Sequence, residues 1–268
     1  MLHIENKKTM TIALRTAGKL LLDNFGRTPK ITVKESDGSI VTETDVQSEK
    51  IILEILDNHP DHFNIISEEC GFIRADSEYT WIVDPIDGTS NFAAGLPWFG
   101  IILALMKDKT PVQAGMYLPL EEQLYYAEKD KGAWRNDKPI RVNSARQLKD
   151  MLLAYSFDHS MDPGKTASEM KLIEKIAANV RNIRSTNSLV DFCYVADGRI
   201  GAVINQTTKI WDIAGPSLII LEAGGSVCDI RKNELDFDVS AGSISRNYSV
   251  VASGQSVHSE LLSLINEE

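Results

Sequence analysis

The chain has 268 residues, of which 43% are hydrophobic and 25% are charged, so it can bury a core and is not a disordered polymer. Its formal net charge of −10 argues against broad nucleic-acid binding, which normally needs a basic surface. No apolar run approaches the roughly 20 residues of a membrane-spanning helix, and three widely spaced cysteines build no disulfide framework, so we expect a soluble, cytoplasmic protein with no membrane partner.

The first half of the chain is predicted to mix helices and strands. Apolar residues at helical spacing from Met10 to Phe25 indicate an N-terminal amphipathic helix. A hairpin is expected over 31–44, with its turn at Asp37 and Gly38. The other elements expected here are, in chain order, a helix over 45–56, strands over 63–67 and 79–83, and a β-rich meander over 98–142.

The second half alternates helices with strands. Helices are expected over 168–180, 185–197, 212–223 and 256–265, and strands over 200–204 and 249–252. Gly198 is placed to end the second of these helices in a left-handed conformation. The chain therefore predicts an α/β fold with an α+β N-terminal half. We expect two subdomains, 1–145 and 146–268, with a cleft between them.

The segment WIVDPIDGTSNF (81–92) is the strongest indication of chemistry. A buried strand would deliver Asp84 at its end, with Asp87 three residues later. Two close carboxylates repel each other, which favours divalent cations between them. The following Gly88-Thr89-Ser90 is typical of a helix N-terminus, whose amides suit a phosphate. The alternative is that Asp-Pro and Asp-Gly are ordinary turn dipeptides.

Further carboxylates lie at predicted element ends. Glu68 and Glu69 follow a strand, where they are either ligands or a solvated charge pair. Asp212, in WDIAGPSLIILEAGG, and Asp45, in VTETD, are either site residues or helix N-caps. The set has no histidine or cysteine at ligand spacing, which favours magnesium, manganese or calcium over zinc. Because neither a hydrolase triad nor a Walker A string is present, a metal-activated water is the favoured nucleophile.

The segments DPIDGTSNF and WDIAGP…EAGG resemble the two signatures of the inositol monophosphatase family, in the superfamily of lithium-sensitive, magnesium-dependent phosphatases. The similarity runs over nearly the whole chain, including VTETD, the Glu-Glu pair and Arg184-Ser185. It implies a layered αβαβα sandwich, a homodimer and two to three Mg²⁺ ions per chain. It also implies hydrolysis of inositol monophosphate, or of a related small polyol or sugar phosphate.

The resemblance also implies roles for individual residues. The first metal ion would be bound by Glu68, Asp84 and the backbone carbonyl of Ile86, and the second by Asp84, Asp87 and Asp212. A third ion would lie at Glu68, with Glu69 and the loop residue Lys34 nearby. Thr89 and Asp45 would orient and deprotonate the attacking water. The phosphate would lie on Gly88, Thr89 and Ser90, and Asp212 would reach a hydroxyl of the polyol.

Two positions depart from the family pattern. Animal inositol monophosphatases carry a glutamate that binds an inositol hydroxyl where this chain has Asn205. The family's Gly-Thr after Arg-Ser is replaced by Asn187-Ser188. Both departures fall in the part of the cleft that binds the alcohol, so they leave specificity for myo-inositol open.

Other functions are compatible with the same fold. The enzymatic alternatives are fructose-1,6-bisphosphatase, a nucleotide 3′-phosphatase, histidinol-phosphatase and NADP phosphatase. The non-enzymatic alternative is a partner of transcription-elongation factors and RNA, as some bacterial relatives are. The converging carboxylates favour an enzyme, because a scaffold does not need them.

Overall fold

The computed structural model describes residues 2–34, 38–145, 147–157 and 162–266. Its helices are α1 (Leu2–Asn24), α2 (Glu43–Asp57), α3 (Thr89–Ala93), α4 (Pro163–Asn179), α5 (Leu189–Ala196), α6 (Ile210–Glu222) and α7 (Gln255–Asn266). Its strands are β1 (Ile31–Val33), β2 (Ile40–Thr42), β3 (Asn64–Ser67), β4 (Gly71–Ile73), β5 (Tyr79–Asp87), β6 (Gly100–Lys107), β7 (Thr110–Leu118), β8 (Gln123–Glu128), β9 (Gly132–Arg135), β10 (Lys138–Pro139), β11 (Leu152–Ser156), β12 (Asn182–Arg184), β13 (Ala202–Thr208), β14 (Gly225–Cys228) and β15 (Tyr248–Gly254). Within this part of the chain, no helix is long and apolar enough to cross a bilayer.

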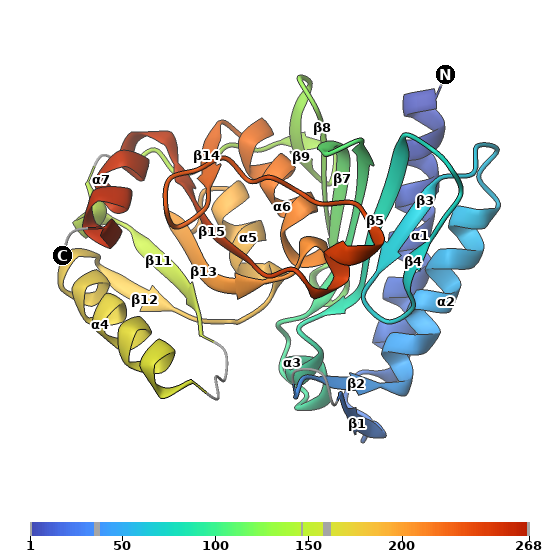
Figure 1. Cartoon of the computed structure of the whole chain (residues 1–268), viewed down its shortest axis with the longest axis horizontal. Coiled ribbons are helices and arrows are strands. Elements are labelled where there is room, and N and C mark those ends of the chain that lie inside the picture. The colour runs from blue at the N-terminus through green and yellow to red at the C-terminus, as the bar shows by residue number, and fades with distance from the viewer. Residues whose placement is uncertain (1, 35–37, 146, 158–161, 267–268) are drawn as a thin grey trace.

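The elements stack in five layers (Figure 1). Helices α1 and α2 cover one face of an eight-stranded sheet of order β10-β9-β8-β7-β6-β5-β3-β4. Helices α5 and α6 fill the space between this sheet and a five-stranded sheet of order β12-β11-β13-β15-β14. Helices α4 and α7 cover the outer face of the second sheet. The predicted αβαβα sandwich is therefore confirmed.

Three apolar cores hold the layers together. The apolar stripe of α1, with Met10, Leu14 and Leu21 fully buried, packs on β6 and β7. Gly115 on β7 permits this close approach, because a Cβ there would lie 2.6 Å from Leu14 Cδ1. The largest core lies between the two sheets, and a third lies under α4 and α7. The first two cores fix the position of β5 from both sides.

Most predicted elements are present, with two corrections of consequence. The strand expected over 79–83 continues to Asp87, through a register shift against β6. The helix expected over 185–197 begins only at Leu189, because Asn187 has a left-handed φ of 54° and Ser188 is an extended N-cap. Gly198 follows with the predicted positive φ. Strands β4, β11, β12 and β14 lie outside the predicted elements, and the predicted turn residue Asp37 lies outside the described residues.

Candidate active site

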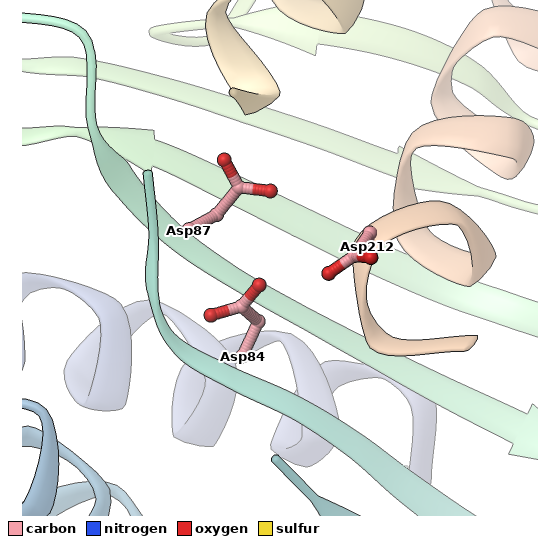
Figure 2. Close-up of side chains that lie close together, drawn as sticks. All are labelled: Asp84, Asp87 and Asp212. Atoms are coloured by element: carbon pink, nitrogen blue, oxygen red, sulfur yellow. The ribbon is translucent and has the colours of Figure 1, made fainter. Parts of the chain in front are cut away.

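Three aspartates converge where β5 meets the first turn of α6 (Figure 2). Each of Asp84, Asp87 and Asp212 places a carboxylate oxygen within 4.8 Å of the other two. In a regular strand, residues three apart point to opposite faces. The register shift between Asp84 and Asp87 breaks that alternation, so both carboxylates face the same cleft.

The electrostatics of this cluster favour a cation. Asp84 is 1% exposed, and its Oδ1 has no hydrogen-bond partner among the described residues. Burial raises the pKa of Asp84 well above its usual range, and the nearby charges of Glu68, Asp87 and Asp212 raise it further. Burial and the charge of Asp212 likewise raise the pKa of Asp87. Buried carboxylates with an orphaned oxygen fit a divalent cation, which would remove the cause of both shifts.

Asp212 and Asp45 occupy the same local position on two different helices. Each was a candidate N-cap, but each is the third helical residue and accepts a hydrogen bond from a backbone N–H three positions earlier. Asp45 Oδ2 accepts from Thr42 N and Asp212 Oδ2 accepts from Lys209 N, both at 2.8 Å. This capping-box arrangement fixes each side chain through Oδ2. Asp45 Oδ1 then contacts Thr89, whereas Asp212 lines the cleft itself.

The short helix α3 begins beside the aspartates. Gly88 precedes it with φ +86°, and a Cβ there would lie 2.5 Å from the carbonyl oxygen of Trp98, so only glycine fits. The hydroxyl of Thr89 lies 2.9 Å from Asp45 Oδ1 and 2.9 Å from the carbonyl oxygen of Ile86. Asp45 is itself fully buried, so Thr89 is its connection to the cleft.

Glu68 and Glu69 follow β3, and both form ion pairs with the ammonium group of Lys34. Lys34 Nζ lies 2.8 Å from a carboxylate oxygen of each. Burial raises the pKa of Glu68 to about 8, with Lys34 opposing this and Asp212 and Glu69 adding to it. Of these three residues, only Glu68 lines the cleft.

The sequence analysis did not identify the buried polar residues Ser48 and Glu49 of α2 as part of the site. Ser48 Oγ donates to the carbonyl oxygen of Pro85 at 2.8 Å. Glu49 accepts from the hydroxyl of Ser67 and from the backbone N–H groups of Glu69 and Cys70. The spacing of the residues could have revealed these contacts, because Ser48 and Glu49 lie on the same face of the helix as the apolar residues. The buried positions of this helix include Asp45, Ser48, Glu49, Ile52 and Leu56. Three polar residues on a core-facing stripe indicate contacts with other polar groups.

A cavity of about 260 Å³ extends from the aspartates toward the second sheet. The predicted site residues that line it are Glu68, Asp84, Ile86, Asp87, Gly88, Thr89, Ser90, Ser188, Asn205 and Asp212. Its far wall is uncharged and polar, and comes from Ser156, Asn187, Asn205 and Thr207. Asn205 Oδ1 accepts from Thr207 N at 2.9 Å, which orients its amide. The far wall therefore offers hydroxyl and amide groups for hydrogen bonding to an alcohol.

Two further contacts at this wall were not expected. Lys165, in the first turn of α4, donates from Nζ to Thr207 Oγ1 at 2.5 Å and lies 3.7 Å from the buried Glu169. Thr208 Oγ1 donates to Asp212 Oδ2 at 2.6 Å. Neither Thr207 nor Thr208 belongs to a sequence motif. Their contacts with Lys165 and Asp212 arise only because the end of β13 lies beside the first turns of α4 and α6.

A model of the inositol monophosphatase family matches residues 6–268. The chain belongs to this family. It is 34% identical to the Nus factor SuhB of Haemophilus influenzae, over 94% of this chain and 92% of that protein. It is also 34% identical to a fructose-1,6-bisphosphatase/inositol-1-monophosphatase of Aquifex aeolicus, over 80% of this chain and 81% of that protein.

The structural comparison agrees with the sequence comparison. The solved structure of the Thermotoga maritima IMPase superposes with a TM-score of 0.84 at 31% identity, covering 97% of each chain. The resemblance seen in the two motifs thus holds across the whole fold, and the family is that of phosphatases of the inositol monophosphatase and fructose-bisphosphatase type.

Proposed function

We propose that this protein is a magnesium-dependent phosphomonoesterase that hydrolyses inositol monophosphate or a related small polyol or sugar phosphate. The observation that carries the proposal is the cluster of Asp84, Asp87 and Asp212, which places buried, mutually repelling carboxylates at one end of a polar cavity. A site of this kind suits cations and a phosphorylated ligand better than an apolar partner.

The oxygen-only donor set fits two to three Mg²⁺ ions. Asp84 with Glu68 and the carbonyl of Ile86 would hold one ion, and Asp84, Asp87 and Asp212 a second. Glu68 with Glu69 would hold a third. When bound, such ions neutralise phosphoryl oxygens and lower the pKa of the attacking water.

The chain's own residues would move the proton. With its hydroxyl hydrogen directed at Asp45 Oδ1, Thr89 presents an oxygen lone pair to a water in the cleft. As that water attacks phosphorus, its proton would pass to Thr89 Oγ1, and the threonine proton would pass to Asp45. The P–O bond to the alcohol would break at the same time, and the departing alkoxide would take a proton from solvent. Burial raises the pKa of Asp45, which makes it a better proton acceptor than an exposed aspartate. The amides of Gly88 and Thr89, with Ser90, would hold the phosphate.

The far wall of the cavity would bind the alcohol. Asn205 offers both a donor and an acceptor where a glutamate would offer charge, and Ser188 lies beside it along the same cavity. Because Asn205 carries no negative charge, it would repel a second phosphate on the substrate less than a glutamate would. We therefore expect a broad enzyme that accepts a sugar bisphosphate alongside inositol monophosphates.

A panel of substrates tests the proposal. Phosphate release would be measured with Mg²⁺ from inositol 1-phosphate, fructose 1,6-bisphosphate, adenosine 3′,5′-bisphosphate and NADP. We expect turnover of the first two and little of the nucleotides. Exclusive turnover of a nucleotide would replace the polyol assignment, and no turnover of any member would overturn the enzymatic one.

The Haemophilus relative named as a Nus factor supports a second candidate, a partner in transcription. The cluster of Asp84, Asp87 and Asp212 favours catalysis instead, because a docking surface has no need for converging carboxylates. The net charge of −10 also gives direct RNA binding no electrostatic support.

A further inference from the structure

A thiol, an imidazole and a hydroxyl form a chain outside the acidic cleft. Cys228 at the end of β14 places Sγ 3.3 Å from His258 Nε2 on α7. The other ring nitrogen, His258 Nδ1, lies 2.8 Å from Ser253 Oγ on β15. These elements belong to the second sheet and its outer helical layer, not to the layers that carry Asp84 and Asp87 (Figure 1).

The three groups can share their hydrogens in an order that leaves a base facing the thiol. Ser253 Oγ lies 3.1 Å from the carbonyl oxygen of Gly254, to which it can donate, and 2.8 Å from His258 Nδ1. In the tautomer that carries its hydrogen on Nδ1, His258 donates to Ser253, and the lone pair of Nε2 faces the thiol of Cys228. Cys228, His258 and Ser253 then correspond to a nucleophile, its base and a third group that orients the base, which is how proteins activate a nucleophile.

Burial keeps the resting pair uncharged. It raises the pKa of Cys228 to about 11, with Asp229 adding to this and Lys232 opposing it. Burial also lowers the pKa of His258, so the imidazole stays neutral and available as a base at pH 7. The thiol then loses its proton only as sulfur attacks, as a serine does beside a histidine. With 8% of its surface exposed, Cys228 can be reached by small reagents only.

The other two thiols have no imidazole beside them among the described residues. Cys193 is fully buried, and its sulfur lies 3.9 Å from Met116 Sδ. Cys70 is exposed, and partial burial together with the charge of Glu49, to which its thiol is hydrogen-bonded, raises its pKa to about 11. Exposure favours modification of Cys70, whereas a neutral imidazole acting as base favours Cys228.

We propose that Cys228 is a modification site for hydroperoxides and small electrophiles, with His258 as its base and Ser253 as the residue that orients the base. With hydrogen peroxide, Sγ attacks one oxygen and the O–O bond breaks. The thiol proton passes to His258 Nε2 and then to the departing hydroxide, which leaves as water. Sulfur is oxidised to the sulfenic acid, and the peroxide is reduced.

The test measures modification of all three cysteines in the magnesium-loaded protein by mass spectrometry. The probes are iodoacetamide and, separately, hydrogen peroxide followed by dimedone. We expect Cys228 to be modified faster than Cys70 and Cys193 in the wild type. His258→Gln should slow modification of Cys228 at least about tenfold, with that of Cys70 unchanged. The matched control His62→Gln, at an exposed histidine, should change neither rate.

Two results would overturn the proposal. The first is a wild-type protein in which Cys70 is modified while Cys228 is not, a ranking that does not depend on any variant folding. The second is a His258→Gln protein in which Cys228 reacts as fast as before or faster, since loosening of the core would speed the reaction and loss of a base slows it. Ser253→Ala should slow Cys228 by a smaller factor, because it removes only the orientation of the imidazole.

Discussion

At the scale of single residues, the cleft uses carboxylates whose two oxygens have separate tasks. Asp45 and Asp212 each give Oδ2 to a helix N-terminus. The remaining oxygen of Asp45 contacts Thr89, and Asp212 contributes an oxygen to the acidic cluster. Replacing such an aspartate by asparagine keeps an acceptor for the backbone and removes the charge, so function and folding can be tested separately.

Asp45→Asn is expected to lower kcat by about 10²-fold or more, the scale of losing a positioned proton acceptor, and to leave KM nearly unchanged. Steady-state kinetics with inositol 1-phosphate would measure both constants. Asp57→Asn, at an exposed aspartate of the same helix, is the control and should leave both unchanged. A change confined to KM would make Asp45 a binding residue instead.

Asn205→Glu is expected to shift preference toward inositol 1-phosphate and away from fructose 1,6-bisphosphate. A carboxylate accepts a stronger hydrogen bond from a hydroxyl than an amide does, and it repels a second phosphate. The change in the ratio of the two kcat/KM values should be about fivefold, or about 1 kcal/mol. Asn182→Glu, at an exposed site on β12, controls for the added charge. An unchanged ratio would mean that residue 205 does not contact substrate.

At the scale of elements, α2 holds the segment that bears the aspartates. Ser48 on α2 binds the carbonyl of Pro85, which lies between Asp84 and Asp87 in the chain. Glu49 holds the turn after β3 by accepting hydrogen bonds from the backbone N–H groups of Glu69 and Cys70. The helix thus supports both carboxylate-bearing strand ends from the side opposite the second sheet.

Ser48→Ala is expected to cost about 1–3 kcal/mol of unfolding free energy, because it leaves a buried carbonyl without its donor. Activity should also fall, since the aspartates lose their support. Urea unfolding followed by circular dichroism would measure the first effect. Ser245→Ala removes an exposed bond from a serine hydroxyl to the carbonyl of Gly242 and should cost under about 0.5 kcal/mol. Equal costs for the two variants would contradict the role given to α2.

At the scale of the whole molecule, the metal-free cleft should destabilise the fold as pH rises. Carboxylates such as Asp84, Asp87 and Glu68 have raised pKa values, so the folded protein binds more protons than the unfolded chain. Stability then falls with rising pH, through the window from about 4.5 to about 8 set by Glu68. Divalent cations that bind only the folded state oppose this loss.

Thermal unfolding at pH 5.5 and pH 8, with and without Mg²⁺, measures this effect. We expect the metal-free Tm to be lower at pH 8, and the gain from Mg²⁺ to be larger there because the carboxylates must lose their protons to bind it. An identical Tm with and without Mg²⁺ at both pH values would contradict the metal assignment.

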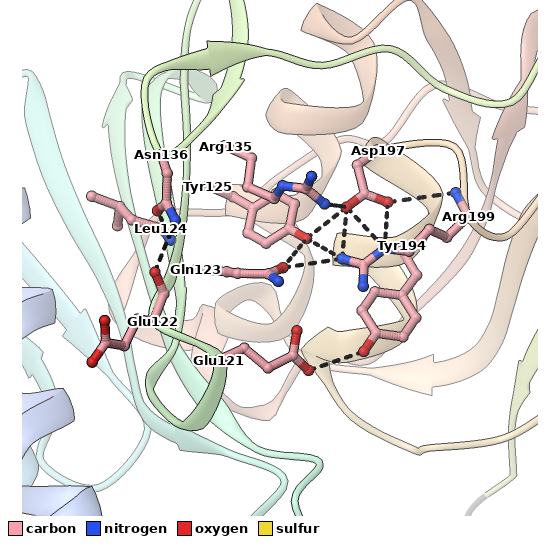
Figure 3. Close-up of polar contacts among 10 residues, drawn as sticks. All are labelled: Glu121, Glu122, Gln123, Leu124, Tyr125, Arg135, Asn136, Tyr194, Asp197 and Arg199. Atoms are coloured by element: carbon pink, nitrogen blue, oxygen red, sulfur yellow. Dashed lines mark hydrogen bonds and ion pairs between the residues drawn. The ribbon is translucent and has the colours of Figure 1, made fainter.

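A polar cluster away from the cleft joins the eight-stranded sheet to the loop between α5 and β13 (Figure 3). Asp197, 3% exposed at its side chain, follows α5 and accepts from the hydroxyl of Tyr125 on β8 and from Arg135 on β9. Arg199 binds the same carboxylate and stacks over Tyr194. The side chains of Arg135 and Arg199 are 38% and 37% exposed, but removing both would leave the buried Asp197 carboxylate without a cation. The cluster thereby helps to keep the framework around the cavity in one arrangement.

The sequence pattern predicted the converging aspartates, and the resemblance to the family predicted the layers, but neither predicted how the aspartates are held. Periodicity located α1, α2 and α6, and the DPIDG string located the metal candidates, because both signals are local. Strand β11 carries no turn signature, and Arg135 and Tyr125 lie 62 and 72 positions from Asp197, which both of them contact. Such contacts depend on the tertiary packing. The expected boundary between 145 and 146 and the expected homodimer stay predictions.

The metal requirement of the phosphatase is tested by measuring phosphate release from inositol 1-phosphate during a Mg²⁺ titration of chelator-treated protein. We expect no release before Mg²⁺ is added, saturable recovery as it is added, and inhibition by Ca²⁺, whose looser coordination misplaces the water. Asp212→Asn should stay about 10²-fold or more below wild type at every Mg²⁺ concentration. Full turnover in excess chelator would show that the reaction does not need a metal ion.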